Sequence, residues 1–100
     1  MRIRDFQSLM RETYFHHDSK RGLRATFNWL KAEIEELGRA IETGDKANLA
    51  EEFADVFAWL TSLANLVEVD VEEACLMRYP GKCPKCGGKP CVCEFRVHPK

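Results

Sequence analysis

The first eighty positions of the sequence contain few residues that interrupt a helix. No proline occurs before Pro80, and glycine occurs in that stretch only at positions 22, 38 and 44. Proline and glycine are the strongest local breaks in regular structure, so their scarcity leaves long uninterrupted segments. Apolar residues recur in these segments at helical spacing, which predicts an all-α fold.

Two further absences limit the functions that we expect of this chain. It has no long apolar run, which argues against a membrane-spanning helix, and the charged start MRIRDFQSLM does not resemble a secretion signal. Neither sign of charge dominates, because the net charge is -1. A general nucleic-acid or membrane-surface binder would be more basic. We therefore expect a cytoplasmic protein with no membrane partner and no nucleic-acid partner.

The periodic segments predict four helices followed by a tail. The expected helices span about residues 3–17, 22–43 and 46–67, and a shorter one ends near Arg78. The polar segment HDSKRG is expected to end the first helix, and Gly44 to end the second. Asp45 and Asp70 are suited to cap the helices that follow them. We expect one all-α domain at residues 1–79 and a separate cysteine-rich tail at residues 80–100.

Two pairs of acids lie beside the apolar stripes of the two long helices. Glu33 and Glu36 are about 60° apart around the second helix, and Glu52 and Asp55 are related in the same way on the third. An antiparallel hairpin about Gly44 places residues equally distant from the glycine at the same level. Three such pairs are Glu33 with Asp55, Glu36 with Glu52, and Trp29 with Trp59.

One groove of this hairpin would carry four carboxylates at one end and two indoles at the other. Four carboxylates so close together repel one another and raise one another's pKa values. A hard cation relieves this repulsion, and ligation by oxygen alone favours Mg²⁺ or Mn²⁺. The alternative is that these acids form a solvated helix face with no metal.

The stretches WLKAEIEELGRAI and NLAEEFADVFAWLTSLA resemble the MazG-type nucleotide pyrophosphohydrolase family. The family pattern appears as Glu33-x-x-Glu36, fifteen intervening residues and Glu52-x-x-Asp55, within a similarity that covers roughly residues 20–78. The resemblance implies a Mg²⁺-dependent enzyme that hydrolyses nucleoside or deoxynucleoside triphosphates to monophosphate and pyrophosphate, with the clearing of unwanted nucleotides as a role. It also implies a helical hairpin or four-helix bundle completed by oligomerisation, as a homodimer or homotetramer. The four acids are then the predicted metal ligands and catalytic residues.

Substrate-binding residues are predicted from the chemistry of a nucleoside triphosphate. The phosphates need basic neighbours, for which Lys20 and Arg21 before the second helix and Arg78 at the end of the fourth are candidates. Trp29 and Trp59 offer aromatic faces on which a nucleobase can stack. The alternatives are ordinary surface charge for the basic residues and packing within the bundle or an interface for the indoles.

Four of the five cysteines lie in the short segment CPKCGGKPCVC. Cys83, Cys86, Cys91 and Cys93 provide four thiolates with a Cys-x-x-Cys knuckle, which fits a tetrahedral zinc ion. Because the protein fills all four positions, this zinc would be structural and not catalytic. The alternatives are disulfides or free thiols.

Two rival functions remain open at this stage. One is a phosphoribosyl-ATP pyrophosphohydrolase-like enzyme of the same superfamily. The other, from a different class, is a non-catalytic zinc-knuckle interaction module on a helical dimer. The four converging acids distinguish the enzymes from the binding module, which has no need of them.

Overall fold

The structure is a computed structural model that describes residues 1–99. Four helices make up the fold: α1 (Ile3–Arg21), α2 (Leu23–Thr43), α3 (Lys46–Leu66) and α4 (Val71–Arg78). None of the described residues forms a strand. The all-α prediction is therefore confirmed. None of the helices within residues 1–99 has the length and apolar character needed to cross a membrane.

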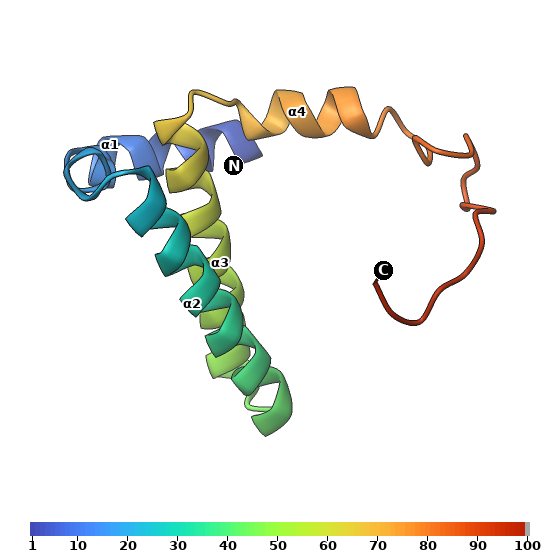
Figure 1. Cartoon of the computed structure of the whole chain (residues 1–100), viewed down its shortest axis with the longest axis horizontal. Helices are drawn as coiled ribbons and strands as arrows, with labels where there is room; N and C mark the ends of the chain where they lie inside the picture. The colour runs from blue at the N-terminus through green and yellow to red at the C-terminus, as the bar shows by residue number, and fades with distance from the viewer. Residues whose placement is uncertain (100) are drawn as a thin grey trace.

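Helices α2 and α3 form the predicted antiparallel hairpin, and they lie side by side along their length (Figure 1). The chain reverses at Gly44, whose φ of 73° is in the left-handed region that glycine adopts without strain. Asp45 then caps α3, since its side chain accepts hydrogen bonds from the backbone N–H groups of Ala47 and Asn48. A turn this short fixes which residues of the two helices face each other.

Helix α1 crosses the end of the hairpin opposite to Gly44 (Figure 1). A buried polar contact joins it to α3 and to the segment that follows. The Gln7 side chain donates to Asn65 Oδ1 at 3.0 Å and to the Val69 carbonyl at 2.7 Å, and it accepts from the Val71 N–H at 2.9 Å. Asn65 donates in return to the Gln7 carbonyl at 3.2 Å. These reciprocal bonds satisfy polar groups that would be costly to bury alone, and they fix the position of α1.

Helix α1 is one turn longer than the sequence predicts. It continues through HDSKR to Arg21, so the prediction that this polar segment ends the helix near residue 17 was wrong. The reason is an ion pair one turn apart, in which Arg21 Nη1 donates to Asp18 Oδ1 at 2.8 Å. Helical spacing brings these two side chains together, and the contact stabilises the last turn. Gly22, with φ of 93°, then ends the helix.

Helix α4 begins at the predicted cap. The Asp70 side chain accepts from the backbone N–H of Glu73 at 3.1 Å and from Arg4 Nε at 2.7 Å. Arg4 also pairs with Glu72 at 3.3 Å, so the start of α4 is tied to α1. From there α4 and the tail lead away from the hairpin (Figure 1).

The apolar stripes of the hairpin are only partly buried within one chain. Leu30, Ala40 and Ala64 are its buried apolar side chains. Other members of the two stripes are exposed by more than a third: Leu23, Phe27, Ile34, Ile41, Phe53, Leu60 and Val67. A single chain therefore leaves much of the surface that was expected to form a core open to solvent.

Candidate active site

Three of the four predicted acids converge in the middle of the hairpin. Glu33 comes from α2, and Glu52 and Asp55 come from successive turns of α3. One carboxylate oxygen from each lies within 4.8 Å of the others. Glu33 and Glu52 are half-buried and Asp55 is exposed. We call these three residues the acidic cluster. Glu33 and Asp55 are equally far from Gly44 in the sequence, so they were predicted to lie side by side in the hairpin. This arrangement agrees with that prediction.

No ion pair neutralises the acidic cluster among residues 1–99. Burial, together with the charges of Asp55 and Glu36, raises the pKa of Glu33 above its ordinary value. Burial also raises the pKa of Glu52, and the charges of Glu33, Glu36 and Asp55 add to the effect. Both shifts mean that the folded protein resists full ionisation of the cluster, so a cation placed among the oxygens would be bound favourably.

Glu36, the fourth predicted acid, lies beside the cluster and outside its closest group of oxygens. Its carboxylate pairs with Arg39, one turn further along α2. Its charge still contributes to the raised pKa values of Glu33 and Glu52. In this arrangement Glu36 is an electrostatic neighbour of the cluster, and its role as a ligand stays a prediction.

The donor set of the cluster fits a hard divalent cation. Glu33, Glu52 and Asp55 offer only carboxylate oxygens, which Mg²⁺ and Mn²⁺ prefer to nitrogen or sulfur. A zinc or copper site would be expected to include histidine or cysteine. No nitrogen or sulfur ligand belongs to this group among the residues that the structure describes.

The two tryptophans stack directly across the hairpin. The ring centroids of Trp29 and Trp59 are 5.2 Å apart, and their planes differ by 5°. The Arg21 guanidinium lies over the Trp59 ring at 4.8 Å from its centroid. The prediction that the two indoles lie at the same level of the hairpin is therefore confirmed. The two rings pack on each other within the hairpin, and Trp59 also lines a cavity, so the predicted stacking of a base on these rings stays a prediction.

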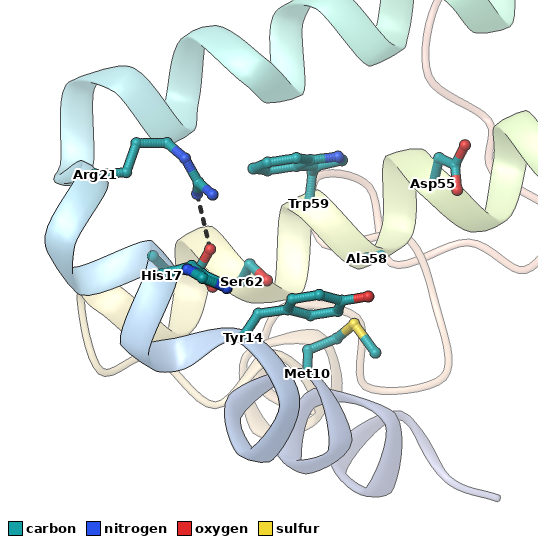
Figure 2. A pocket seen from close by; sticks show the side chains of 9 residues that line it. Met10, Tyr14, His17, Arg21, Asp55, Ala58, Trp59 and Ser62 are labelled. Atoms are coloured by element: carbon teal, nitrogen blue, oxygen red, sulfur yellow. Dashed lines mark hydrogen bonds and ion pairs between the residues drawn. The ribbon is translucent and has the colours of Figure 1, made fainter.

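A cavity of about 300 Å³ lies between α1 and α3, next to the acidic cluster. Figure 2 shows Trp59 on one side of it, Tyr14 and Met10 on the other, and Asp55 at one end. The remaining lining residues are His17, Asp18, Arg21, Ala58 and Ser62. Its volume is at the lower end of the range for small-molecule sites. Asp55 belongs both to this cavity and to the acidic cluster, so the two are continuous.

The cavity includes residues that sequence reasoning did not select. Asp18 belongs to the polar segment that is predicted to end the first helix, yet it is only 2% exposed and lines the cavity wall. Its spacing of three residues from Arg21 was the available signal, because such pairs meet on a helix. Tyr14 and Met10 belong to an apolar stripe at helical spacing on α1. The direction of that stripe, toward α3 and the cavity, depends on how α1 crosses the hairpin.

Two predicted substrate-binding residues are not brought to the acids. Lys20 is exposed near the end of α1 and does not line the cavity. Arg78 ends α4, where its guanidinium lies over the Tyr79 ring at 5.9 Å from the centroid. Since α4 leads away from the hairpin (Figure 1), Arg78 does not reach the acidic cluster of its own chain in this arrangement.

Comparison with protein families gives one match. Residues 21–86 match the family model described as MazG nucleotide pyrophosphohydrolase domain. The chain belongs to this MazG family. The match includes the acidic cluster, both tryptophans and the first two cysteines of the tail. A comparison with curated proteins gives no match.

Beyond the helices of the MazG domain, the four tail cysteines form a second candidate metal site. Their Sγ atoms all lie within 4.8 Å of one another. Cys83 Sγ is 3.8 Å from Cys93 Sγ, and Cys86 Sγ is 3.8 Å from Cys91 Sγ. Four sulfurs at about 2.3 Å from a tetrahedral zinc would be about 3.8 Å apart. A disulfide would need about 2.05 Å, and all five cysteines of the chain are free thiols here.

Backbone N–H groups already favour thiolates in this cysteine cluster. Val92 and Gly88 donate to Cys86 Sγ at 3.3 and 3.4 Å, and they lower the pKa of Cys86 to about 6. The neighbouring sulfurs instead raise the pKa of Cys93 to about 12, because four thiols at this separation cannot all ionise unaided. The cluster therefore could bind a zinc ion, which would complete its ionisation.

Proposed function

We propose that this MazG-family protein is a Mg²⁺-dependent pyrophosphohydrolase that converts nucleoside or deoxynucleoside triphosphates to monophosphates and pyrophosphate. The observation that carries the proposal is the position of Asp55, which belongs both to the acidic cluster and to the adjoining cavity. A metal that binds phosphate and a cavity that accepts a nucleoside would then lie side by side. Manganese would serve the same oxygen ligands.

In this proposal the acidic cluster holds the cation and the cavity holds the nucleoside. Glu33, Glu52 and Asp55 are the ligands, and Glu36 adds negative potential from beside Arg39. A bound Mg²⁺ would supply charge neutralisation at the phosphate oxygens and make water more acidic. Phosphoryl transfer needs positioning and electrostatic stabilisation more than covalent help, and a rigid helical hairpin suits that task.

We also propose that the protein works as a homodimer or homotetramer. The support is the exposure of the hairpin stripes, where Ile34, Ile41 and Phe53 are each at least half exposed. Exposed apolar surface on this scale marks an interaction site. Pairing two hairpins would bury it in a four-helix arrangement. Arg78 could then approach the acidic cluster of a neighbouring subunit. It would contact the phosphates of a nucleotide bound there, as the sequence predicts.

The proposal is tested by measuring pyrophosphate release from a panel of nucleoside and deoxynucleoside triphosphates with and without Mg²⁺. Phosphoribosyl-ATP belongs in the panel, since a phosphoribosyl-ATP pyrophosphohydrolase-like enzyme is the alternative hypothesis within the same superfamily. We expect release that requires Mg²⁺ and falls at least about a hundredfold in Asp55→Ala. Glu42→Gln is the matched control, because Glu42 is an exposed acid on α2 that is not part of the cluster. No pyrophosphate from any substrate would leave the non-catalytic interaction module as the better explanation.

A further inference from the structure

One aspartate that lines the cavity between α1 and α3 has a buried carboxylate oxygen without a hydrogen-bond partner among residues 1–99. Asp18 is 2% exposed and lines the cavity. Its Oδ1 accepts from Arg21 Nη1 at 2.8 Å, while its Oδ2 has no hydrogen-bond partner among the described residues. Leaving a carboxylate oxygen buried without a donor opposes folding, so such groups often have a functional reason.

The position of Asp18 is held by its own surroundings. Arg21 Nη1 also approaches Thr26 Oγ1 at 3.3 Å, and Thr26 is fully buried at the start of α2. The guanidinium in turn lies over the Trp59 ring. These contacts fix Oδ1 and leave Oδ2 as the acceptor that remains for a ligand. An ionised carboxylate accepts hydrogen bonds and donates none, so the matching ligand atom must carry a hydrogen.

The other walls of the cavity indicate a flat ligand. Trp59 and Tyr14 lie on opposite sides of the space (Figure 2), and Met10 adds a thioether beside Tyr14. Aromatic faces accept nucleobases by stacking. The phosphates of a nucleotide would lie at the Asp55 end, where a cation held by the acidic cluster can neutralise them. The base edge is then directed toward Asp18.

We infer that Asp18 Oδ2 recognises the exocyclic amino group of a nucleobase, so that cytosine and adenine are preferred to their deaminated counterparts uracil and hypoxanthine. The amino groups of cytosine and adenine present N–H donors. Uracil and hypoxanthine place a carbonyl oxygen at the same position, and its lone pairs would face the carboxylate. This inference rests on the proposed function for its ligand class and adds to it a preference among bases.

The test uses the full chain and the product nucleotides, so that it does not depend on catalysis. Tryptophan fluorescence is titrated with dCMP against dUMP and with AMP against IMP, at one Mg²⁺ concentration. We expect the amino-bearing member of each pair to have a Kd at least about tenfold lower, as for loss of a hydrogen bond to a buried charged group. The pyrimidin-2-one nucleotide, which replaces the amino group of dCMP with hydrogen, should bind about as weakly as dUMP.

Asp18→Asn supplies the matched variant. Its amide can donate to a carbonyl oxygen, so we expect the ratio between dUMP and dCMP to fall to about one or to reverse. Glu12→Gln is the control, because Glu12 is exposed on the same helix and does not line the cavity; it should keep the wild-type ratio. Equal binding of the paired nucleotides to the wild-type chain, or no binding of any of them at millimolar concentration, would overturn the inference without need of a folded variant.

The two proposals can fail separately. Base discrimination that depends on Asp18, with no pyrophosphate released from any triphosphate, would remove the proposed enzyme activity and leave a nucleotide-binding protein. Pyrophosphate release with no difference between cytosine and uracil nucleotides would keep the enzyme and overturn the role of Asp18. A preference that Asp18→Asn leaves unchanged would also overturn that role.

Discussion

Trp29 and Trp59 stack across the α2–α3 hairpin with their planes within 5° of parallel. Trp29 precedes Glu33 by four residues, and Trp59 follows Asp55 by four. The indole pair therefore lies one turn from the facing acids and helps to keep α2 and α3 in the alignment that brings Glu33 to Asp55. The stack supports the acidic cluster mechanically, although neither ring is part of it.

Trp29→Ala should weaken both the hairpin and its metal site. Aromatic pairs contribute about 0.5–1.5 kcal/mol beyond the area they bury, so we expect a loss of about 1 kcal/mol or more in the free energy of unfolding. A weaker alignment should also raise the Mg²⁺ Kd. Chemical denaturation and Mg²⁺ titration measure the two effects. Trp29→Phe, which retains an aromatic ring, should lose less stability and less Mg²⁺ affinity than Trp29→Ala. Equal Mg²⁺ affinity in wild type and Trp29→Ala would show that the stack does not support the cluster.

Removing one acid should stabilise the metal-free protein and weaken its response to Mg²⁺. The pKa of Glu33 is raised in the folded state, so its ionisation opposes folding. Stability without metal should fall as the pH rises from the ordinary glutamate value of 4.5 through the raised value. Glu33→Gln removes the contribution of Glu33 to this dependence and leaves that of Glu52. Wild type at a Mg²⁺ concentration one hundred times its Kd should gain about 2.7 kcal/mol, and Glu33→Gln should gain much less.

Thermal unfolding across this pH range, with and without Mg²⁺, checks both parts of that expectation. Glu42→Gln again serves as the control on α2 and should behave as wild type. Without metal at neutral pH, Glu33→Gln should be at least as stable as wild type. A lower unfolding temperature for this variant would contradict the interpretation that the acids of the cluster repel one another.

The contact between α1 and α4 should weaken in acid. The Glu73 backbone N–H and the Arg4 guanidinium lower the pKa of Asp70. A carboxyl group whose pKa is lowered on folding contributes stability above its ordinary value, here 3.8, and that contribution is lost as the pH falls through the lowered value. The protection of the α4 amides, which is the exchange rate of the unfolded chain divided by the observed rate at the same pH, should therefore fall over this range. In Asp70→Asn this protection should already be low at neutral pH and should change little in acid.

Metal analysis should find about one zinc per chain, as a single four-thiolate site requires. Cys86→Ser should lose this zinc and leave the helical content of α1–α3 unchanged, because the tail leads away from the hairpin. Cys75→Ser is the matched control, since Cys75 is an exposed cysteine on α4 outside the cluster. Full zinc content in Cys86→Ser, or none in wild type, would exclude the proposed site.

The hairpin and its acidic cluster were predictable because both depend on local rules. Helical periodicity and a one-glycine turn set the level of each residue, and this placed Trp29 opposite Trp59 and Glu33 opposite Asp55. The bounds of α2–α4 also follow within a residue or two from Gly44, Asp45 and Asp70. The spacing of the four tail cysteines likewise predicted that their sulfur atoms would lie close together.

The cavity was not predictable, because it depends on where α1 crosses the hairpin. That crossing is set by contacts such as Gln7 with Asn65, which are 58 residues apart and leave no periodic signal. The burial of Asp18 follows from the same crossing. The polar composition of HDSKR favoured a loop, and only the pairing of Asp18 with Arg21 explains why the helix continues.

Asp55 connects two sites that would otherwise be independent. If an occupant of the cavity changes the affinity of the acidic cluster for Mg²⁺ by some factor, then Mg²⁺ changes the affinity of the cavity for that occupant by the same factor. A nucleotide that raises the Mg²⁺ affinity of the acidic cluster should therefore bind more tightly as Mg²⁺ is added. If two nucleotides couple to Mg²⁺ by different factors, the preference between them shifts toward the more strongly coupled one as Mg²⁺ rises, which links the choice of nucleotide to the supply of free cation in solution.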